Sequence, residues 1–361
     1  MLDLQATYRL SRHLIIRPGL NSFVLETPLD SGKLLLAKSS VFKLLLALSK
    51  PTRLIDLLTA VEESQRTKLR EFLDQCYERH LLTLVLEDGR AEEDLNSLAH
   101  WEFHDLVFHT YSRPTRHNQP FGATYRFRGL LPEEPCFKPS EENGDLLPLP
   151  KPDLEALKLE DMPLTLALEN RRSLHGLEPI SFDNLGEFLY RTCRVTGTSS
   201  DGIGMEVIRK VYPSGGSLHP LEVYLVANRC LGLERGMYRY RAADHALAYI
   251  QTLDTDVEKF LSDASRACGG LPDYPPVLLI IAARFRRTAW KYQSIAYHVT
   301  LMEAGTLLQT MYLVATAMRL APCALGSGDS DHFARVAGTD YYLETSIGEF
   351  ILGRTPAEPS T

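Results

Sequence analysis

The N-terminal part of the chain alternates short apolar runs with polar turns. Residues 21–26 and 34–37 are predicted as two short strands, with Asp30-Ser31-Gly32 as the turn of a hairpin. Apolar residues then recur at helical spacing. Helices are predicted after a Ser39-Ser40 cap, over 54–61 and over 66–80, followed by a strand over 81–86. A strand pair, three helices and a closing strand predict a small winged-helix-like unit.

The C-terminal part alternates helix and strand patterns. Residues 276–285 form a nearly uninterrupted apolar run, which is typical of a strand buried on both faces. Residues 293–320 are apolar nearly all round and predict a long, central, buried helix. Further elements are a helix over 184–192, capped by Ser181 or Asp183, strands over 221–227 and 347–354, and a hairpin over 236–250.

A less regular stretch joins the two parts. Residues 100–113 have helical spacing, whereas residues 131–163 are rich in proline and acidic groups and predict a linker or wrapping arm. The expected fold class is therefore α+β. The predicted domains are 1–95 (winged-helix-like), 96–160 (helical connector and linker) and 161–361 (larger domain).

Composition and charge narrow the class of protein. The 361 residues are 44% hydrophobic and 24% charged, with a net charge of −7. An acidic chain argues against broad contact with nucleic acid. There is no apolar run long enough for a membrane span and no secretory signal, so we expect a cytoplasmic protein. The six cysteines never form a Cys-x-x-Cys pair, and the histidines are scattered, so no metal site is predicted.

A basic segment follows an apolar helical stretch. Arg171, Arg172 and Ser173 place two guanidinium groups and a hydroxyl side by side, which suits a phosphate monoester. Basic residues are also common at helix C-termini, where they complement the helix dipole. This segment alone therefore leaves both interpretations open.

A glycine-containing loop leads into the predicted strand at 221–227. It exposes backbone N–H groups that a flat ring or an anion can approach closely. It is neither a P-loop nor a dinucleotide-binding turn, and an ordinary connecting loop is an equal alternative. The residues concerned are Pro213, Ser214, Gly215, Gly216 and Ser217.

Two further segments flank the long helix. Lys291 and Tyr292 precede it and could move a proton or hold an anionic intermediate, although a lysine and a tyrosine at a helix start are commonly structural. After the helix, Leu325, Gly326, Ser327 and Gly328 offer a second backbone-donor loop, or simply a helix-terminating turn.

Together these segments resemble the SagB-type (McbC-like) azoline dehydrogenases of the nitroreductase superfamily. The resemblance covers residues 96–361 and rests on four motifs in the family's order. The most specific is Tyr-Pro-Ser-Gly-Gly-Ser-Leu-His-Pro-Leu-Glu-Val-Tyr at 212–224. The others are Arg-Arg-Ser at 171–173, Lys-Tyr at 291–292 and Gly-Glu-Phe-Ile-Leu-Gly-Arg at 348–354.

The resemblance implies a dimeric nitroreductase-like domain that binds FMN in a cleft at the subunit interface. Arg171, Arg172, Ser173 and Arg354 would hold the FMN phosphate. The loop from Pro213 to Ser217 would line the flavin ring, and the loop from Leu325 to Gly328 would approach the cofactor. Lys291 and Tyr292 match the family's catalytic pair, with the base left open between them.

The implied reaction is dehydrogenation of peptide thiazolines or oxazolines to thiazoles or oxazoles, with reoxidation of the flavin by oxygen. The N-terminal unit resembles small peptide-clamp domains, and a cyclodehydratase is an expected partner. Three alternatives remain: a nitroreductase that takes hydride from NAD(P)H, a flavin-free peptide-binding scaffold, and an oxidase of a nonribosomal assembly line.

Overall fold

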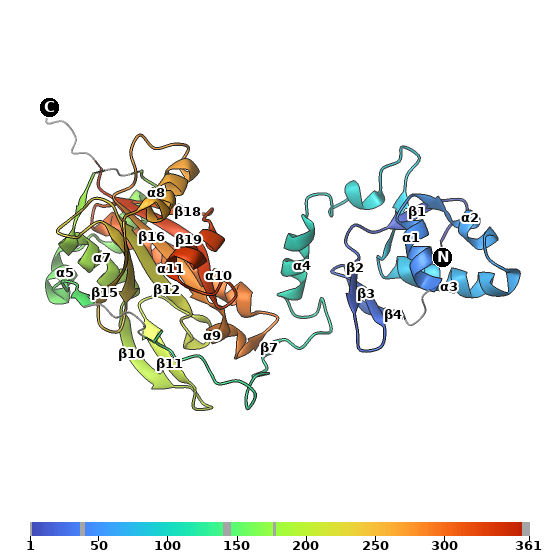
Figure 1. The fold of residues 1–361 in the computed structure, drawn as a ribbon, viewed down its shortest axis with the longest axis horizontal. Helices are drawn as coiled ribbons and strands as arrows, with labels where there is room; N and C mark the ends of the chain where they lie inside the picture. Colours follow the sequence, from blue (N-terminus) through green and yellow to red (C-terminus); the bar gives the residue numbers. More distant parts are fainter. Residues whose placement is uncertain (1, 37–39, 140–145, 176–177, 356–361) are drawn as a thin grey trace. The chain divides into compact units, whose positions relative to one another are not determined.

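The computed structural model describes residues 2–36, 40–139, 146–175 and 178–355. The chain divides into two compact units, residues 1–121 and 122–361 (Figure 1). The connector predicted over 96–160 is thus shared between the two units. The helix cap predicted at Ser39 lies outside the described residues.

The first unit combines two small sheets with four helices. One sheet has the order β5-β1-β6 and the other β2-β3-β4, with every pair antiparallel. The buried leucines of the sheets and helices, among them Leu25, Leu45, Leu54 and Leu73, form one core. The elements are β1 (Thr7–Leu10), β2 (Ile15–Pro18), β3 (Phe23–Thr27), β4 (Asp30–Leu36), α1 (Ser40–Leu48), β5 (Thr52–Arg53), α2 (Leu54–Thr59), α3 (Glu63–Glu78), β6 (Leu82–Val85) and α4 (Phe103–Tyr111).

The hairpin of this unit turns earlier than predicted. Thr27 pairs with Asp30, so the two-residue turn is Pro28-Leu29, and the Asp30–Gly32 segment already belongs to β4. Proline fixes its own φ and is well suited to a turn, which the apolar pattern alone did not weigh. The prediction also missed β1, which pairs with the closing strand β6.

The second unit is built on one seven-stranded sheet with the order β18-β19-β16-β12-β14-β15-β8, all antiparallel. The fully buried strand β16 (Val277–Arg284) lies near its centre. The other strands of the sheet are β8 (Leu146–Pro148), β12 (Leu221–Ala227), β14 (Gly236–Arg241), β15 (Ala246–Thr252), β18 (Ala321–Leu325) and β19 (Glu344–Gly353).

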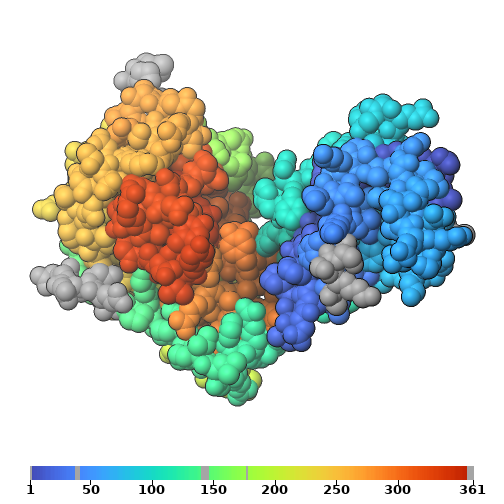
Figure 2. All heavy atoms as spheres, turned by 45° about the vertical axis from the view of Figure 1, so that its right-hand side comes forward, coloured from blue at the N-terminus to red at the C-terminus, as the bar shows by residue number. Residues whose placement is uncertain are grey.

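Helices cover both faces of this sheet because its central strands are apolar on both sides. On β12, Val223 and Leu225 face the cluster that contains α7 (Phe182–Cys193) and α10 (Ala296–Ala317). Tyr224 and Val226 face the opposite cluster with α8 (Thr255–Ala267) and α11 (Ser330–Ala337). The latter two helices lie side by side on the surface (Figure 2). The result is a three-layer, mixed helix and sheet unit, as the sequence predicts.

The long helix α10 is buried along one face only. Its buried positions, such as Thr300, Ala304, Leu307 and Met311, recur every three or four residues, whereas Tyr297 and Met302 are exposed. The prediction of an all-round buried helix is therefore wrong for the single chain, and an apolar face is left uncovered.

The proline-rich arm is more than a linker, because its β8 is the edge strand of the main sheet. The buried Arg287 also holds the arm: its guanidinium donates to the carbonyl oxygens of Glu134, Glu206 and Leu218. The remaining elements of this unit are β7 (Gly122–Ala123), α5 (Leu154–Glu160), α6 (Leu164–Asn170), β9 (Ile180–Ser181), β10 (Val195–Ser200), β11 (Glu206–Lys210), β13 (Cys230–Leu231), α9 (Phe285–Ala289) and β17 (Tyr292–Gln293).

Candidate functional site

The predicted glycine loop and the predicted Lys-Tyr pair lie together. A methyl group added to Gly216 would stand 2.6 Å from the Tyr292 hydroxyl and 3.2 Å from Lys291 Nζ. Gly216 has φ +66, a left-handed conformation that glycine adopts at little cost. Gly215 and Gly216 thus bring bare backbone against two groups that can exchange a proton.

Lys291 is held by a carboxylate that the sequence reasoning did not identify. Its Nζ lies 3.2 Å from Oδ2 of Asp201, in the turn between β10 and β11. Burial by itself lowers the pKa of Lys291. The hydrogen bond to Asp201 and the neighbouring Tyr292 and Tyr125 raise the pKa by more than burial lowers it, so it lies above its ordinary value. Lys291 is therefore an ammonium group at neutral pH.

A buried polar cluster of Ser214, His219 and Glu303 holds the glycine loop in its conformation. The Ser214 hydroxyl donates to Glu303 of α10 and accepts from the His219 backbone N–H. His219 Nδ1 lies 3.4 Å from Oε1 of Glu303, and both side chains are buried. Because its oxygen is occupied in this way, Ser214 organises the loop rather than offering a free group to a ligand.

An open groove of about 570 Å³ is lined by residues that neighbour Lys291 and Asp201 in the sequence. Trp290, next to Lys291 in the chain, lines it together with Ile203 and Gly204, which follow Asp201 closely. The groove is walled on its other side by residues 128–133 of the arm.

The predicted phosphate segment is attached to the far end of α10. The Arg171 guanidinium lies 5.3 Å from the centre of the Tyr312 ring. The Tyr312 hydroxyl lies 2.8 Å from Ser173 Oγ and accepts the Ala324 N–H at 2.7 Å. The exposed Arg172 donates only to the nearby carbonyls of Glu169 and Arg171. Among the described residues, no ion pair to an acidic group is formed by either guanidinium group.

Arg354 approaches the same edge of the sheet through backbone pairing. Its N–H and C=O bond to Glu178 at 3.0 and 3.1 Å, and the Leu174 N–H donates to Pro322 at 2.8 Å. Pro322 in turn pairs with Leu352 on β19. The chain after α6 thus runs beside the end of β18 and β19, which carries Arg354.

The two groups of candidate residues sit at different ends of α10. Ser214 contacts Glu303, and a Cβ on Gly215 would lie 3.4 Å from Val299, whereas Arg171 contacts Tyr312. Glu303 and Tyr312 are nine residues apart, or about 14 Å along a helix axis. Within one chain, the phosphate segment and the glycine loop are therefore separate patches on one helix.

The second glycine loop packs elsewhere. Among the described contacts, Gly326, Ser327 and Gly328 are not joined to Lys291 or Arg171; the loop lies beside α8, where Lys259 pairs with Asp329 at 3.1 Å. A methyl group on Gly328 would meet Glu349 Oε1 at 2.4 Å. Burial, followed by the charge of Asp263, raises the pKa of Glu349 to about 7. The placement of this loop on a cofactor remains a prediction.

Several of these residues could not be found from sequence. Asp201, Glu303 and Tyr312 are distant in the chain from the groups that they hold, and none belongs to a recognisable motif. A weak signal existed for Tyr312, since a tyrosine in an otherwise apolar helix needs a partner for its hydroxyl. Over the described residues, no helix has the length and apolar character to cross a membrane.

Two family models match the chain. The model of the cyanobactin oxidase ThcOx matches residues 8–118, within the first unit, and the nitroreductase family model matches residues 177–354, within the second.

Three relatives agree with these matches. A nitroreductase of Methanocaldococcus jannaschii is 31% identical over 51% of this chain and 86% of its own length. The trifolitoxin-processing protein TfxB of Rhizobium leguminosarum is 26% identical over 57% of each chain. The microcin B17-processing protein McbC of Escherichia coli is 32% identical over 31% of this chain and 42% of its own. The chain thus spans about half the length of these two processing proteins.

Among solved structures, the E. coli microcin synthetase McbBCD complex with truncated pro-MccB17 bound matches with a TM-score of 0.41 and 19% identity, over 66% of this chain and 89% of that one. The family assignment does not depend on this weak structural likeness. It follows from the M. jannaschii relative and the nitroreductase match over the three-layer unit. With its Arg-Arg-Ser, Ser-Gly-Gly-Ser and Lys-Tyr segments in place, this chain belongs to the nitroreductase family, and its relatives there include McbC-like processing proteins.

Proposed function

We propose that the protein is an FMN-dependent dehydrogenase that oxidises thiazolines or oxazolines in a peptide to thiazoles or oxazoles. The carrying observation is that Tyr292 and Lys291, with Asp201 paired to the lysine, meet at the bare backbone of Gly216. Similarity to an oxidase model and to two processing proteins supports a peptide substrate.

The residues present fit FMN in their chemistry. Arg171 and Arg172 offer guanidinium groups to a phosphate, with Ser173 and Arg354 near the same sheet edge. Gly215 and Gly216 carry no side chain that would keep a flat ring from the loop backbone, and the ring loop as predicted runs from Pro213 to Ser217. When bound, FMN supplies the two-electron acceptor that aromatising an azoline requires.

Proton handling falls to the Lys-Tyr pair. Removing the ring proton of an azoline leaves negative charge beside the amide carbonyl, and an ammonium group stabilises such charge. The Asp201 partnership keeps Lys291 charged, so we assign charge stabilisation to Lys291. Removal of the ring proton is assigned to Tyr292 acting as a phenolate, because a neutral hydroxyl cannot accept that proton; its oxygen lies nearest the glycine loop.

A homodimer would complete the site. The phosphate segment and the glycine loop are set on opposite ends of α10, and this helix exposes Tyr297 and Met302 while α6 exposes Leu164, Leu166 and Leu168. A two-fold axis crossing α10 would place the Tyr312 end of one protomer beside the Glu303 end of its partner. We propose that FMN lies between these two ends.

The first unit would hold the precursor peptide. Its sheet β2-β3-β4 has two edge strands that can pair with an extended segment. Ile16 and Leu35 on these strands and Phe23 on β3 are exposed large apolar side chains. A cyclodehydratase that forms the azolines is the proposed enzyme partner.

The test is oxidation of a synthetic thiazoline peptide by the purified protein, followed by mass spectrometry for the loss of two hydrogens. The native protein should carry flavin absorption bands and convert the peptide, whereas Lys291→Ala should keep the flavin and lose conversion. Lys259→Ala, which removes a lysine of α8, is the matched control. A native rate in Lys291→Ala would contradict the assignment.

The alternatives give different results in simple assays. Rapid bleaching of the flavin on anaerobic mixing with NADPH would favour a nitroreductase that uses nicotinamide. A colourless protein that cannot be loaded with FMN would favour a flavin-free scaffold. Activity confined to carrier-protein-bound thiazolines would favour a nonribosomal pathway.

A further inference from the structure

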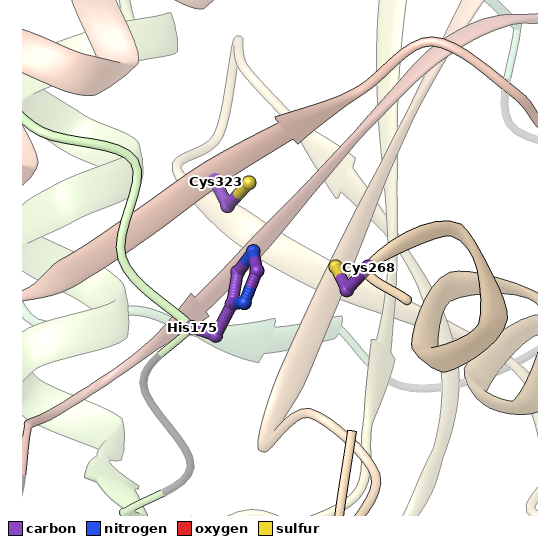
Figure 3. A group of neighbouring side chains, drawn as sticks. All are labelled: His175, Cys268 and Cys323. Atoms are coloured by element: carbon purple, nitrogen blue, oxygen red, sulfur yellow. The ribbon is translucent and has the colours of Figure 1, made fainter. Parts of the chain in front are cut away.

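We propose that His175, Cys268 and Cys323 form a binding site for a zinc ion. One ligand atom from each of these residues lies within 4.8 Å of the other two. The three side chains converge from the chain after α6, the end of α8 and strand β18 (Figure 3). This site uses none of the residues assigned to the flavin, although His175 lies two residues after Ser173 and Cys323 two residues before Leu325.

The spacing suits tetrahedral zinc. With Zn–S bonds near 2.3 Å and Zn–N bonds near 2.0 Å, neighbouring ligand atoms stand roughly 3.5–3.8 Å apart. The ligand atoms now lie within 4.8 Å of one another, so side-chain rotations that move each of them by about 1 Å would bring them to this spacing. Two thiolates and an imidazole are ligands that zinc prefers, whereas magnesium and calcium prefer oxygen. A water molecule would complete the fourth position on the solvent side.

The backbone fixes all three positions. Cys323 sits in the sheet, paired with Ile351 of β19. Cys268 caps α8, and its N–H donates to Ala264 at 3.2 Å. His175 follows Leu174, whose N–H donates to Pro322, the residue before Cys323. A site held by three elements is preorganised, which lowers the cost of ordering its ligands on binding.

The ligands are available and can be reached. Among the described residues, no hydrogen bond or ion pair engages the His175 imidazole, and the Cys323 thiol contacts the Ala324 carbonyl at 3.5 Å and the thiol of Cys268, the other proposed sulfur ligand. Both thiols are free. His175 is exposed and Cys268 half-buried, while Cys323 is buried, so an ion can enter from the His175 side.

A bound ion would tie the chain after α6 to both β18 and α8. At present this stretch is held to β18 by the Leu174 N–H and by the Tyr312 hydroxyl between Ser173 and Ala324. The zinc would add a third attachment from the opposite side of the sheet edge. Its expected role is therefore structural.

The experiment measures metal binding by the full-length protein after reduction and removal of metal with a chelator. We expect one equivalent of Zn²⁺ per chain by elemental analysis, and Co²⁺ in its place should give thiolate-to-metal charge-transfer absorption. His175→Gln and Cys268→Ser should each weaken Zn²⁺ binding about a hundredfold or more. Cys230→Ala, which removes a buried thiol outside the cluster, should bind as the native protein does.

Folding of each variant is checked by its metal-free melting temperature; that of His175→Gln should match the native value because His175 is exposed. Zinc should raise the melting temperature of the native protein and of Cys230→Ala, but not of His175→Gln. No Zn²⁺ retained, or equal retention in all variants, would overturn the proposal. So would a reduced protein that binds no metal and forms a Cys268–Cys323 disulfide on oxidation.

Discussion

At the scale of single residues, the chemistry of this protein depends on partners that adjust common side chains. Lys291 is a plain lysine in sequence, but Asp201 at 3.2 Å keeps it charged despite its burial. Glu349 is a plain glutamate whose pKa rises to about 7 because burial penalises its charged form. In both cases the neighbours decide the protonation state.

Asp201→Asn should shift the pH profile of the reaction. Without Asp201, burial dominates and the pKa of Lys291 falls, so its positive charge is lost at lower pH. The alkaline limb of kcat/KM should therefore move to lower pH, with flavin content unchanged. Asp183→Asn, an exposed position in the first turn of α7, should leave the limb in place.

Two results would contradict this role for Asp201. An unmoved alkaline limb would mean that Asp201 does not control Lys291. If kcat/KM instead increased with pH over the range in which Lys291 loses its proton, neutral Lys291 would be the base, contrary to the role assigned to it.

Glu349→Gln should make the protein more stable at pH 8. The folded pKa of Glu349 is raised from 4.5 to about 7, so the native state binds the extra proton between these values. The free energy of unfolding should thus fall as pH rises from 4.5 to 7, by about 3 kcal/mol at 1.36 kcal/mol per unit. Urea unfolding of both proteins at pH 5 and pH 8 measures this, and an equal pH dependence would refute it.

At the scale of elements, α10 is the axis of the candidate site. Its Glu303 holds Ser214 of the glycine loop, and its Tyr312 holds Ser173 of the phosphate segment. Its length and apolar character could be predicted from sequence, because helical periodicity is local. Which residues it contacts could not be predicted, since these lie about 90 to 140 positions away in the chain.

Gly216→Ala should disrupt the turn at the site. Left-handed φ costs an L-residue about 1–2 kcal/mol, and the new methyl would overlap the Tyr292 hydroxyl at 2.6 Å. Thermal unfolding should show a loss of this size or larger, together with lost oxidation. Gly202→Ala, whose Cβ would meet open space, should change stability by less than about 0.5 kcal/mol. Equal stability of the two variants would argue against a strained, crowded turn at Gly216.

At the scale of the whole molecule, the chain joins two units whose matches differ. The oxidase model covers the first unit and the nitroreductase model the second. The sequence predicted a winged-helix-like unit before the larger domain, and this fold class is confirmed. The proposed division of labour is that the first unit binds the precursor and the second performs the oxidation.

Leu166→Glu should break the proposed dimer. Leu166 is exposed on α6, and a buried carboxylate at a two-fold interface is strongly unfavourable. Light scattering should show a dimer for the native protein and a monomer for the variant, with FMN retention weakened at least about tenfold. Leu20→Glu, a fully exposed position in the first unit, should remain dimeric. A native protein that is monomeric with full flavin content would refute the interface.

The sequence by itself determined the fold class, the strands β12, β14, β15, β16 and β19, the helices α7 and α10, and the motif segments, because periodicity, turn chemistry and short motifs are local properties. Only the tertiary structure decided that Asp201 pairs with Lys291, that the Ser214 hydroxyl donates to Glu303, and that His175, Cys268 and Cys323 converge. Such contacts depend on how strands pair across the sheet, and this pairing cannot be predicted from the spacing of residues along the chain.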